Sequence, residues 1–284
     1  MKKTGIILAL IIAFAFSPKK QDATILQVEN SSFREKLTSV PSKSRLVLLD
    51  YYFNNEWRKD AASNSSTRWH YVWEDQANSG FSIWGEIFRK QGMQIASLET
   101  EPTKKKLKEA GIYIIVDPDT EKETEKPNYI TEKHADVITK WVKKGGVLIL
   151  MGNDSINANL KSMNVLSSRF GIHFNEDQFN PVLNRQWEQG SVMVPASHSV
   201  FTSPKKLYLK EVSTLQVSAP ATTILSKDGK NIMAISRYGK GVVFALGDPW
   251  IYNEYIDNRL LPSDFENNKG AEDLVRWAIS QVKD

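Results

Sequence analysis

Residues 241–255 read GVVFALGDPWIYNEY, an apolar run followed by a segment with two acids, an amide and three aromatic residues. Residues 45–57 read RLVLLDYYFNNEW and share this layout, with an aspartate directly after the apolar run and an Asn-Glu pair further on. Short, continuous apolar runs are typical of strands that are buried on both faces of a sheet. Both stretches therefore predict a buried strand whose carboxyl end is followed by polar and aromatic side chains.

Similar apolar runs alternate with amphipathic patterns along the first part of the chain. In residues 79–92, Trp84, Ile87 and Phe88 recur at helical spacing, and Gly92 marks the end of the helix. Strand–helix–strand alternation with short connections predicts an α/β fold with a mainly parallel, doubly wound sheet. The expected strands are 45–52, 93–99, 111–117, 147–151 and 171–174, and the expected helices are 79–92, 102–110, 131–145 and 157–170.

The second half of the chain is richer in strands. The pair Gly239-Lys240 separates two apolar runs, which predicts a hairpin. A final amphipathic helix is expected over residues 271–282, with Leu274 and Trp277 against the core. The other strands expected here are 191–195, 205–212, 222–226, 231–239 and 241–247.

The N-terminus has the layout of a secretory signal peptide. Lys2 and Lys3 precede a continuous apolar run over residues 5–16, and Ala13-Phe14-Ala15 offers small residues at cleavage spacing. An uncleaved membrane anchor is the alternative, but the run is shorter than the ~20 residues that a membrane-spanning helix needs. We therefore predict a signal peptide and cleavage region over residues 1–22, a lead-in linker over 23–44 and a single domain over 45–284. The mature protein is expected to be periplasmic or secreted, without stable membrane insertion.

The composition excludes several kinds of chemistry. The 284 residues include no cysteine, which rules out disulfides, a thiol nucleophile and cysteine metal ligands. The formal net charge is +4, but the basic residues are dispersed, and the cluster 104–106 is interpreted as a solvated helix face. No histidine pair at metal-ligand spacing and no phosphate-binding glycine loop occurs. We therefore expect no metal, no cofactor and no nucleic-acid partner.

Four of the predicted strands end in acidic or amide side chains. Ligands of open α/β sheets bind outside the carboxyl ends of the strands, so these side chains share one edge if the strands are neighbours. Acids and amides beside aromatic faces suit a saccharide, and paired acids could act as general acid and base on a glycosidic bond. The strand-end residues are Asp50, Asp117, Asp119, Asn153, Asp154 and Asp248, with Asn54, Asn55, Glu56, Asn253 and Glu254 just beyond.

The same acids also have a structural interpretation. An aspartate after a strand commonly caps a helix or closes an Asx turn, and Asp154 is well placed to do so. The histidines are equally open: His198, in a loop, and His70, in the stretch WHYVW (69–73), could each be a catalytic base or could cap a turn or stack on neighbours. His134 and His173 are interpreted as structural.

Three stretches carry a resemblance to a known family: VDPDTEKET (116–124), WVKKGGVLILMGND (141–154) and GDPWIYNEY (247–255). The chain resembles the class I glutamine amidotransferase-like domain of unknown function that is fused to or associated with unsaturated rhamnogalacturonyl (glycuronyl) hydrolases of Bacteroidetes. The resemblance implies a three-layer α/β/α fold of the amidotransferase or flavodoxin-like type and a role in the breakdown of pectin or another uronate-containing polysaccharide. Amidotransferases carry a cysteine where this sequence has Gly152-Asn153-Asp154, so glutamine hydrolysis through a thioester is excluded.

We therefore predict an exported protein that binds a uronate-containing oligosaccharide and, if it is an enzyme, hydrolyses it, with an unsaturated glycuronyl hydrolase as a further candidate partner. The alternative is a non-catalytic module that docks a glycan or a partner protein. The residues predicted to be catalytic are Asp154, His198, Asp248 and Glu254. The residues predicted to bind substrate are Asp50, Asn55, Glu56, Trp57, Asp117, Asp119, Trp250 and Asn253, with Trp57 and Trp250 as a stacking platform.

Overall fold

The structure is a computed structural model, and it describes residues 45–59 and 64–283. The predicted signal peptide and linker, residues 1–44, lie outside the described residues. Within the described ranges, no helix combines the length and the apolar character that crossing a membrane requires.

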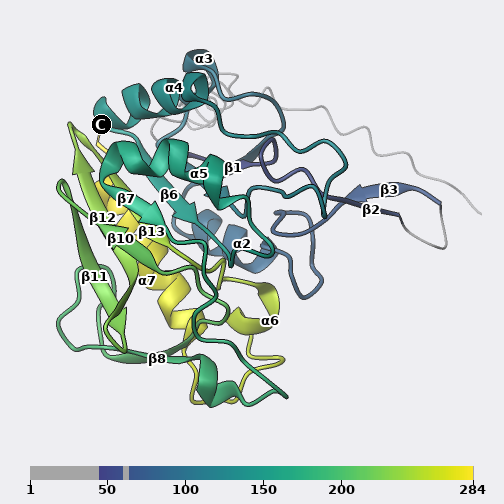
Figure 1. The fold of residues 1–284 in the computed structure, drawn as a ribbon, viewed down its shortest axis with the longest axis vertical. Coiled ribbons are helices and arrows are strands. Elements are labelled where there is room, and N and C mark those ends of the chain that lie inside the picture. Colours follow the sequence, from purple (N-terminus) through teal and green to yellow (C-terminus); the bar gives the residue numbers. More distant parts are fainter. Residues whose placement is uncertain (1–44, 60–63, 284) are drawn as a thin grey trace, which may run out of the picture. The chain divides into compact units, whose positions relative to one another are not determined.

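A seven-stranded sheet lies at the centre of the fold (Figure 1). Five neighbouring strands, from β13 to β4, run parallel, whereas β11 and β12 pair in antiparallel fashion at one side. The α/β class and the mainly parallel sheet predicted from the sequence are therefore confirmed. In spatial order the strands are β11 (Ala221–Lys227), β12 (Lys230–Tyr238), β13 (Gly241–Leu246), β6 (Val147–Met151), β5 (Ile112–Val116), β1 (Leu46–Asp50) and β4 (Gln94–Leu98).

Side chains of the parallel strands alternate between two apolar cores. In β6, for example, Ile149 belongs to one core and Leu148 and Leu150 belong to the other. Because consecutive residues of a strand point to opposite faces, a continuous apolar run requires that both faces are covered. The first core includes residues of α2 (Ser82–Lys90) and α7 (Asn267–Gln281), and the second includes residues of α3 (Lys104–Leu107), α4 (Glu132–Lys143) and α5 (Leu160–Ser167).

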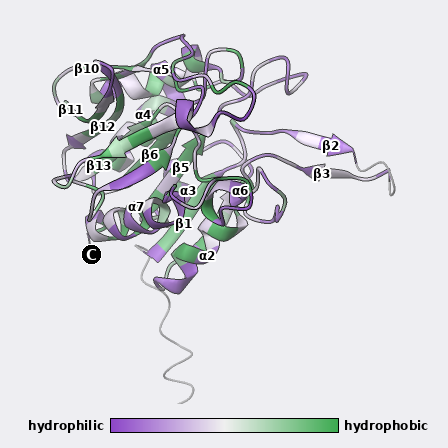
Figure 2. Ribbon diagram, turned by 90° about the horizontal axis from the view of Figure 1, so that it is seen from below, coloured by the Kyte–Doolittle hydropathy of each residue, from purple (hydrophilic) through white to green (hydrophobic). Residues whose placement is uncertain are grey.

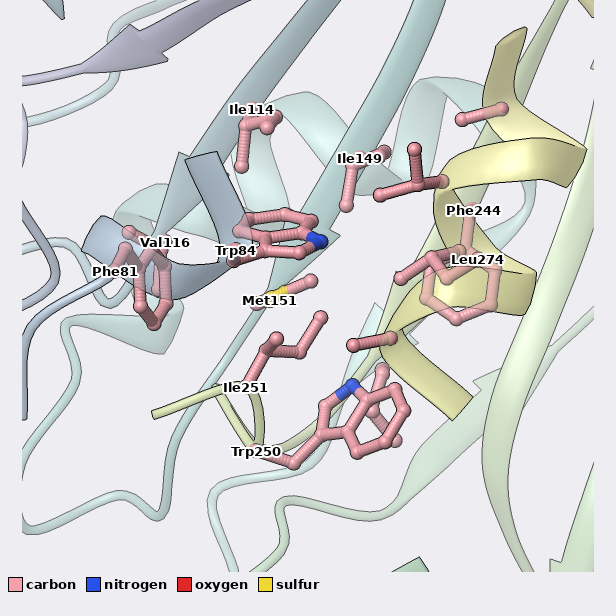
Figure 3. Close-up of a cluster of buried hydrophobic side chains, with 14 of the residues drawn as sticks. Phe81, Trp84, Ile114, Val116, Ile149, Met151, Phe244, Trp250, Ile251 and Leu274 are labelled. Atoms are coloured by element: carbon pink, nitrogen blue, oxygen red, sulfur yellow. The ribbon is translucent and has the colours of Figure 1, made fainter. Parts of the chain in front are cut away.

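The core between the sheet, α2 and α7 contains two buried tryptophans (Figure 3). Trp84 lies among strand side chains such as Ile149 and Met151, and Trp250 lies beside Ile251 in the same cluster. Both tryptophans are 0% exposed. Large aromatic side chains at such positions account for much of the stability of a core, so both residues primarily hold the fold together.

Three small antiparallel pairs complete the strands. They are β2 (Trp57–Lys59) with β3 (Ser66–Arg68), β7 (Ile172–Phe174) with β10 (Leu215–Val217), and β8 (Ser191–Val194) with β9 (Lys205–Tyr208). The β2–β3 hairpin is not predicted from the sequence, and it extends away from the central sheet in two views (Figures 1 and 2). The remaining helical elements are the short α6 (Asn253–Ile256) and the 3-10 turns η2 (Ser168–Phe170) and η3 (Trp187–Gly190).

Several expected elements need correction. The helices expected over 102–110 and 157–170 are shorter, at Lys104–Leu107 and Leu160–Ser167. The strand expected over 205–212 ends at Tyr208, and the final helix begins at Asn267 instead of Ala271. The strand at 172–174 pairs with β10 outside the central sheet. The predicted hairpin at Gly239-Lys240 is confirmed: Gly239 has φ of 61°, and a β-carbon there would lie 2.6 Å from the Lys143 carbonyl oxygen, so the turn requires glycine.

Candidate functional site

The strand order brings the polar strand ends together. β13, β6, β5 and β1 are neighbours and run parallel, so their carboxyl ends lie at the same edge of the sheet. Asp117 follows β5 directly, Asn153 follows β6 and Asp248 follows β13. The prediction that these strand ends converge is confirmed, and the edge is the one at which open α/β sheets bind ligands.

A pocket of about 210 Å³ lies at this edge. Its wall combines strand ends with residues that are distant in sequence, from the segment after β3 to α6. Five carboxyl side chains, three tyrosines and two asparagines line it, together with one lysine, one histidine and one serine. The lining residues are His70, Tyr71, Ser79, Asp117, Glu123, Asn153, Asn157, Lys210, Glu211, Asp248, Tyr252, Glu254 and Tyr255.

Asp117 occupies the β5 side of the pocket. Its backbone has φ of 43°, a left-handed conformation that a residue with a side chain seldom adopts and that often marks functional sites. The Asn153 amide donates a hydrogen bond of 3.2 Å to Oδ2, while Oδ1 is buried without a partner. Burial, reinforced by the charge of Glu123, raises the pKa of Asp117 to about 7.

Asp248 occupies the β13 side of the pocket. It is 2% exposed, and its Oδ2 accepts a hydrogen bond of 2.7 Å from the Lys210 backbone N–H. Burial raises the pKa of Asp248 to about 8, against the opposing effects of Lys210. Because β6 lies between β5 and β13 and adjacent strands are ~4.8 Å apart, the backbones that carry Asp117 and Asp248 are separated by about 10 Å.

Glu254 adds a third carboxyl group from α6. Its Oε2 is buried without a partner, and burial raises the pKa of this side chain as well. The neighbouring Asn253 fixes the helix that carries it: the Asn253 Oδ1 accepts from the Ile83 backbone N–H at 3.0 Å, and its Nδ2 donates to the Asp75 and Ala77 carbonyls at 2.9 Å. Asn253 is 0% exposed, so its side chain positions α6. The sequence-based prediction that Asn253 contacts a ligand therefore does not fit its position.

His70 and Glu56 form a side-chain pair. Glu56 is among the site residues predicted from the sequence, whereas His70 is not in that set. His70 Nδ1 lies 3.0 Å from Glu56 Oε1, and His70 and Tyr71 both have positive φ, of 67° and 56°. Burial alone would lower the pKa of His70, but the hydrogen bond and charge of Glu56, with Asp117 and Glu123, raise it. Glu56 thus acts behind the pocket wall, and the His70 ring belongs to the wall itself.

Replacing Glu56 by glutamine is expected to lower the pKa of the His70 imidazole, because the amide keeps the shape of the side chain and removes its charge. An NMR titration of the histidine ring signals measures this pKa directly. The exposed Glu125→Gln variant removes the same charge elsewhere on the surface and is the matched control. An unchanged His70 titration in the Glu56 variant would show that the pair has no electrostatic role.

Three tyrosines supply the aromatic surface of the pocket. The rings of Tyr71 and Tyr252 are stacked at 5.5 Å with an interplanar angle of 28°, and the Tyr255 ring lies edge-on to Tyr252 at 5.2 Å. The hydroxyl groups of Tyr71 and Tyr252 are 3.4 Å apart. None of these tyrosines was among the predicted site residues, although Tyr252 and Tyr255 belong to the segment DPWIYNEY (248–255).

Several predicted site residues are engaged with the backbone instead. Asp50 Oδ1 accepts hydrogen bonds from the Tyr52 and Phe53 N–H groups at 3.0 and 2.6 Å, and Oδ2 accepts from the Tyr113 hydroxyl. Asp154 Oδ1 accepts from the Ile156 N–H at 2.8 Å, and neither aspartate lines the pocket. For both, the structural interpretation as turn or cap residue fits their position, because their acceptor oxygens are occupied.

The Asp119 side chain also lies outside the pocket lining. Its Oδ2 accepts from the Asn55 N–H at 2.9 Å and from the Thr124 hydroxyl, which ties the segment after β1 to the segment after β5. Asn55 in turn accepts a hydrogen bond of 3.2 Å from the Trp57 indole N–H. These three predicted binding residues therefore form a separate group between the sheet edge and the β2–β3 hairpin.

Trp250 and His198 do not fit their predicted roles. Trp250 is fully buried in the core of Figure 3 and offers no face on which a ligand could stack. His198 is not among the pocket residues: its Nδ1 accepts from the Val200 and Phe201 N–H groups at 3.1 and 3.2 Å, and burial lowers its pKa. A neutral histidine in this arrangement closes a turn, which was the alternative interpretation.

Comparisons with known proteins bear on the fold. No protein-family model matches the sequence, and no curated protein is significantly similar to it. The N-terminal domain of mmIFT52 superposes with a TM-score of 0.58 at 18% identity, covering 82% of this chain and 96% of that one. Two Salmonella typhimurium cytoplasmic proteins, STM1381 and STM3548, superpose with TM-scores of 0.53 and 0.50 at 13% identity, covering 84% of this chain and 99% and 98% of theirs. At these identities the similarity shows a shared fold and carries no information about function.

Proposed function

We propose that the pocket at the carboxyl edge of the sheet binds a saccharide and that its buried carboxyl groups act as general acid and base. The proposal rests above all on Asp117 and Asp248, which line one pocket from either side of Asn153 and both have a carboxyl pKa raised towards neutrality. A carboxyl group that stays protonated near neutral pH can donate a hydrogen bond or a proton, which an ordinary aspartate cannot.

The rest of the lining supports a polyhydroxylated ligand. Sugar hydroxyl groups can accept and donate hydrogen bonds, and the asparagine, serine and tyrosine side chains of the lining are of the types that can do both. The rings of Tyr71, Tyr252 and Tyr255 place apolar surface next to these groups.

The placement of acids on both sides of the pocket suits glycoside hydrolysis with a water molecule as nucleophile. In this mechanism Asp248 protonates the leaving glycosidic oxygen, while Asp117 or Glu254 accepts a proton from a water whose oxygen bonds to the anomeric carbon as the glycosidic C–O bond breaks. In inverting hydrolases the two carboxyl groups lie on opposite sides of the sugar with room for this water between them. The base gains one proton for each proton that Asp248 loses, so transfer of that proton back to Asp248 restores both groups after turnover.

The sequence resemblance extends the proposal to a biological setting. We propose a three-layer, amidotransferase-like fold, export to the periplasm or the medium, and action on a uronate-containing polysaccharide together with an unsaturated glycuronyl hydrolase. The helices that pack into both cores support the fold assignment. The two basic side chains of the pocket, Lys210 and His70, already lie 2.6 Å and 3.0 Å from Glu211 and Glu56, so the proposal does not assign the uronate carboxylate to either of them.

A second candidate function is a non-catalytic glycan-binding module. It is favoured by the number of strand-end acids whose oxygens already accept backbone hydrogen bonds, namely Asp50, Asp119 and Asp154. One oxygen of Asp248 also accepts a hydrogen bond from the Lys210 backbone N–H. In this alternative the same pocket binds the saccharide and releases it unchanged.

A binding and turnover assay on unsaturated rhamnogalacturonan fragments separates these candidates. If the protein is an enzyme, Asp248→Asn is expected to retain binding and to lower turnover by about 10²–10⁴-fold, the usual contribution of a general acid. Glu109→Gln, on the exposed surface, is the matched control and should leave both unchanged. Binding without any product from the unsubstituted protein would favour the module. Absence of binding and of turnover across pectic, ulvan-like and glycosaminoglycan oligosaccharides would contradict the proposal.

A further inference from the structure

The β2–β3 hairpin extends away from the body of the protein (Figures 1 and 2), and its sequence carries basic and aromatic residues. We define the arm as residues 57–59 and 64–69. It contains Arg58, Lys59 and Arg68 and no acidic residue, and Asp60 lies outside the described residues. Trp57 is 54% exposed, an unusual degree of exposure for tryptophan in a soluble protein.

The aromatic and basic side chains of the arm are ordered against each other. The Arg68 guanidinium lies over the Trp57 ring at 4.9 Å and over the Tyr51 ring at 5.1 Å, and it donates a hydrogen bond of 2.9 Å to the Tyr51 carbonyl oxygen. The Trp57 indole N–H donates a hydrogen bond of 3.2 Å to Asn55 Oδ1. These contacts hold the Trp57 ring in one orientation while one part of it stays exposed, which is the property of a preformed stacking surface.

The arm is connected to the pocket by a run of stacked rings. Trp69 stacks on His70 at 4.2 Å and 3°, and His70 stacks on Tyr71 at 4.2 Å and 16°. His70 and Tyr71 line the pocket, whereas Trp69 belongs to the arm. The Arg58 guanidinium lies 5.8 Å from the Trp69 ring centre. A ligand that leaves the pocket on this side therefore meets Trp69 and Arg58 next.

The pocket and the arm differ in charge, because acidic side chains outnumber basic ones in the pocket and the arm contains only basic ones. Even with Asp117 and Asp248 protonated, three glutamates of the lining face Lys210 and His70, so the pocket offers an additional carboxylate no excess of positive charge. Arg58 and Lys59 have no ion-pair partner among the described residues, so their charges are available to an anion. The two surfaces together suit a ligand with an uncharged end and an anionic continuation.

We propose that the arm is the binding surface for the anionic part of an acidic oligosaccharide, of which one uncharged sugar unit occupies the pocket and the adjoining uronate units lie along Trp57, Arg58 and Lys59. This inference rests on the proposed saccharide function of the pocket. It goes beyond that function by assigning the uronate units to the arm and a neutral unit to the pocket.

Isothermal titration calorimetry on the full chain tests the inference. The probes are a rhamnogalacturonan tetrasaccharide, which alternates neutral and uronate units, and the same tetrasaccharide with its carboxyl groups reduced to alcohols. The double variant Arg58→Gln/Lys59→Gln is expected to bind the acidic probe about three- to tenfold more weakly and the reduced probe unchanged. Trp57→Ala is expected to weaken both probes by about tenfold. Lys104→Gln/Lys105→Gln, on the exposed face of α3, removes the same charge and should change neither.

Salt supplies an independent readout, because exposed charges are screened at high ionic strength. Binding of the acidic probe should weaken with salt in the unsubstituted protein and lose this dependence in the arm double variant. Equal affinity for both probes, no effect of the double variant, or equally tight binding of a single-stranded oligonucleotide through Arg58 and Lys59 would each overturn the arm inference while the pocket proposal stands. Failure of the unsubstituted protein to bind either probe would overturn both.

Discussion

Replacing Asp248 by asparagine is expected to stabilise the protein at pH 8 and to make its stability less dependent on pH. In the folded protein burial raises the pKa of Asp248 to about 8 from its ordinary value of 3.8. The folded state therefore retains a proton that the unfolded chain has already released at any pH between these values. Each pH unit within that window lowers the free energy of unfolding by ~1 kcal/mol for such a group. Asparagine removes this term and can still accept the Lys210 N–H bond.

The sign of the effect follows from the number of bound protons. The unfolded state binds fewer protons than the folded state above pH 4, so stability falls as pH rises towards 8. Asp50, Asp117 and Asp119 have pKa values raised to about 6, 7 and 7, and they act in the same direction. His70, with its raised pKa, contributes stability below its ordinary pKa of 6.5 that is also lost with rising pH. The protein is thus expected to be more stable at pH 5 than at pH 8.

Urea unfolding at pH 5 and pH 8 measures this difference for the unsubstituted protein and for Asp248→Asn. The difference between the two pH values should shrink in the variant, and the gain should appear at pH 8. Glu109→Gln is the control, because it removes an exposed carboxyl group. Stability that rises from pH 5 to pH 8, or an Asp248→Asn variant that is less stable at pH 8, would show that the carboxyl group is ionised and favourably solvated in the folded state.

Replacing Trp250 by alanine is expected to lower the free energy of unfolding by ~3–5 kcal/mol. The indole is fully buried beside Ile251 and Leu274, and truncation would leave a large cavity between the sheet and α7. Gly270 of α7 packs against this ring: a β-carbon at Gly270 would lie 2.8 Å from it. Truncation therefore removes the ring against which this part of α7 packs.

Trp57 provides the contrast, since both tryptophans follow an apolar strand in matching segments of the sequence. Trp57→Ala is expected to change the free energy of unfolding by less than about 0.5 kcal/mol, the usual range for exposed positions. Thermal or urea unfolding of both variants measures the difference. Comparable destabilisation by the two substitutions would contradict the assignment of Trp250 to the core and of Trp57 to the surface.

The arrangement of the sheet could be predicted from the sequence because continuous apolar runs and short crossovers restrict the topology. The convergence of Asp117, Asn153 and Asp248 follows from that topology alone. The β2–β3 hairpin could not be predicted, because its three-residue strands, WRK (57–59) and STR (66–68), have no apolar alternation. A strand with one buried face shows alternating apolar and polar residues, and it is this alternation that makes a strand recognisable in a sequence.

The sequence could not predict which strand-end acid faces the pocket, because the direction of each side chain depends on the local backbone conformation. Asp154 and Asp117 both follow a buried strand and read alike in the sequence. The Asp154 carboxyl group turns back onto the N–H groups of the next residues, whereas Asp117 has a positive φ and one unpartnered oxygen. The walls that complete the pocket, at His70 and Lys210, are distant in sequence from both.

The position of a bound saccharide can be measured directly. Titrating the isotope-labelled protein with a rhamnogalacturonan tetrasaccharide and following the backbone amide signals by NMR locates the site residue by residue. We expect the largest changes at Asn153, Lys210 and Tyr252 in the pocket, with smaller changes along residues 57–59 of the arm. Changes confined to other surfaces, or no changes at a saturating concentration of the tetrasaccharide, would contradict the saccharide site at the carboxyl edge of the sheet.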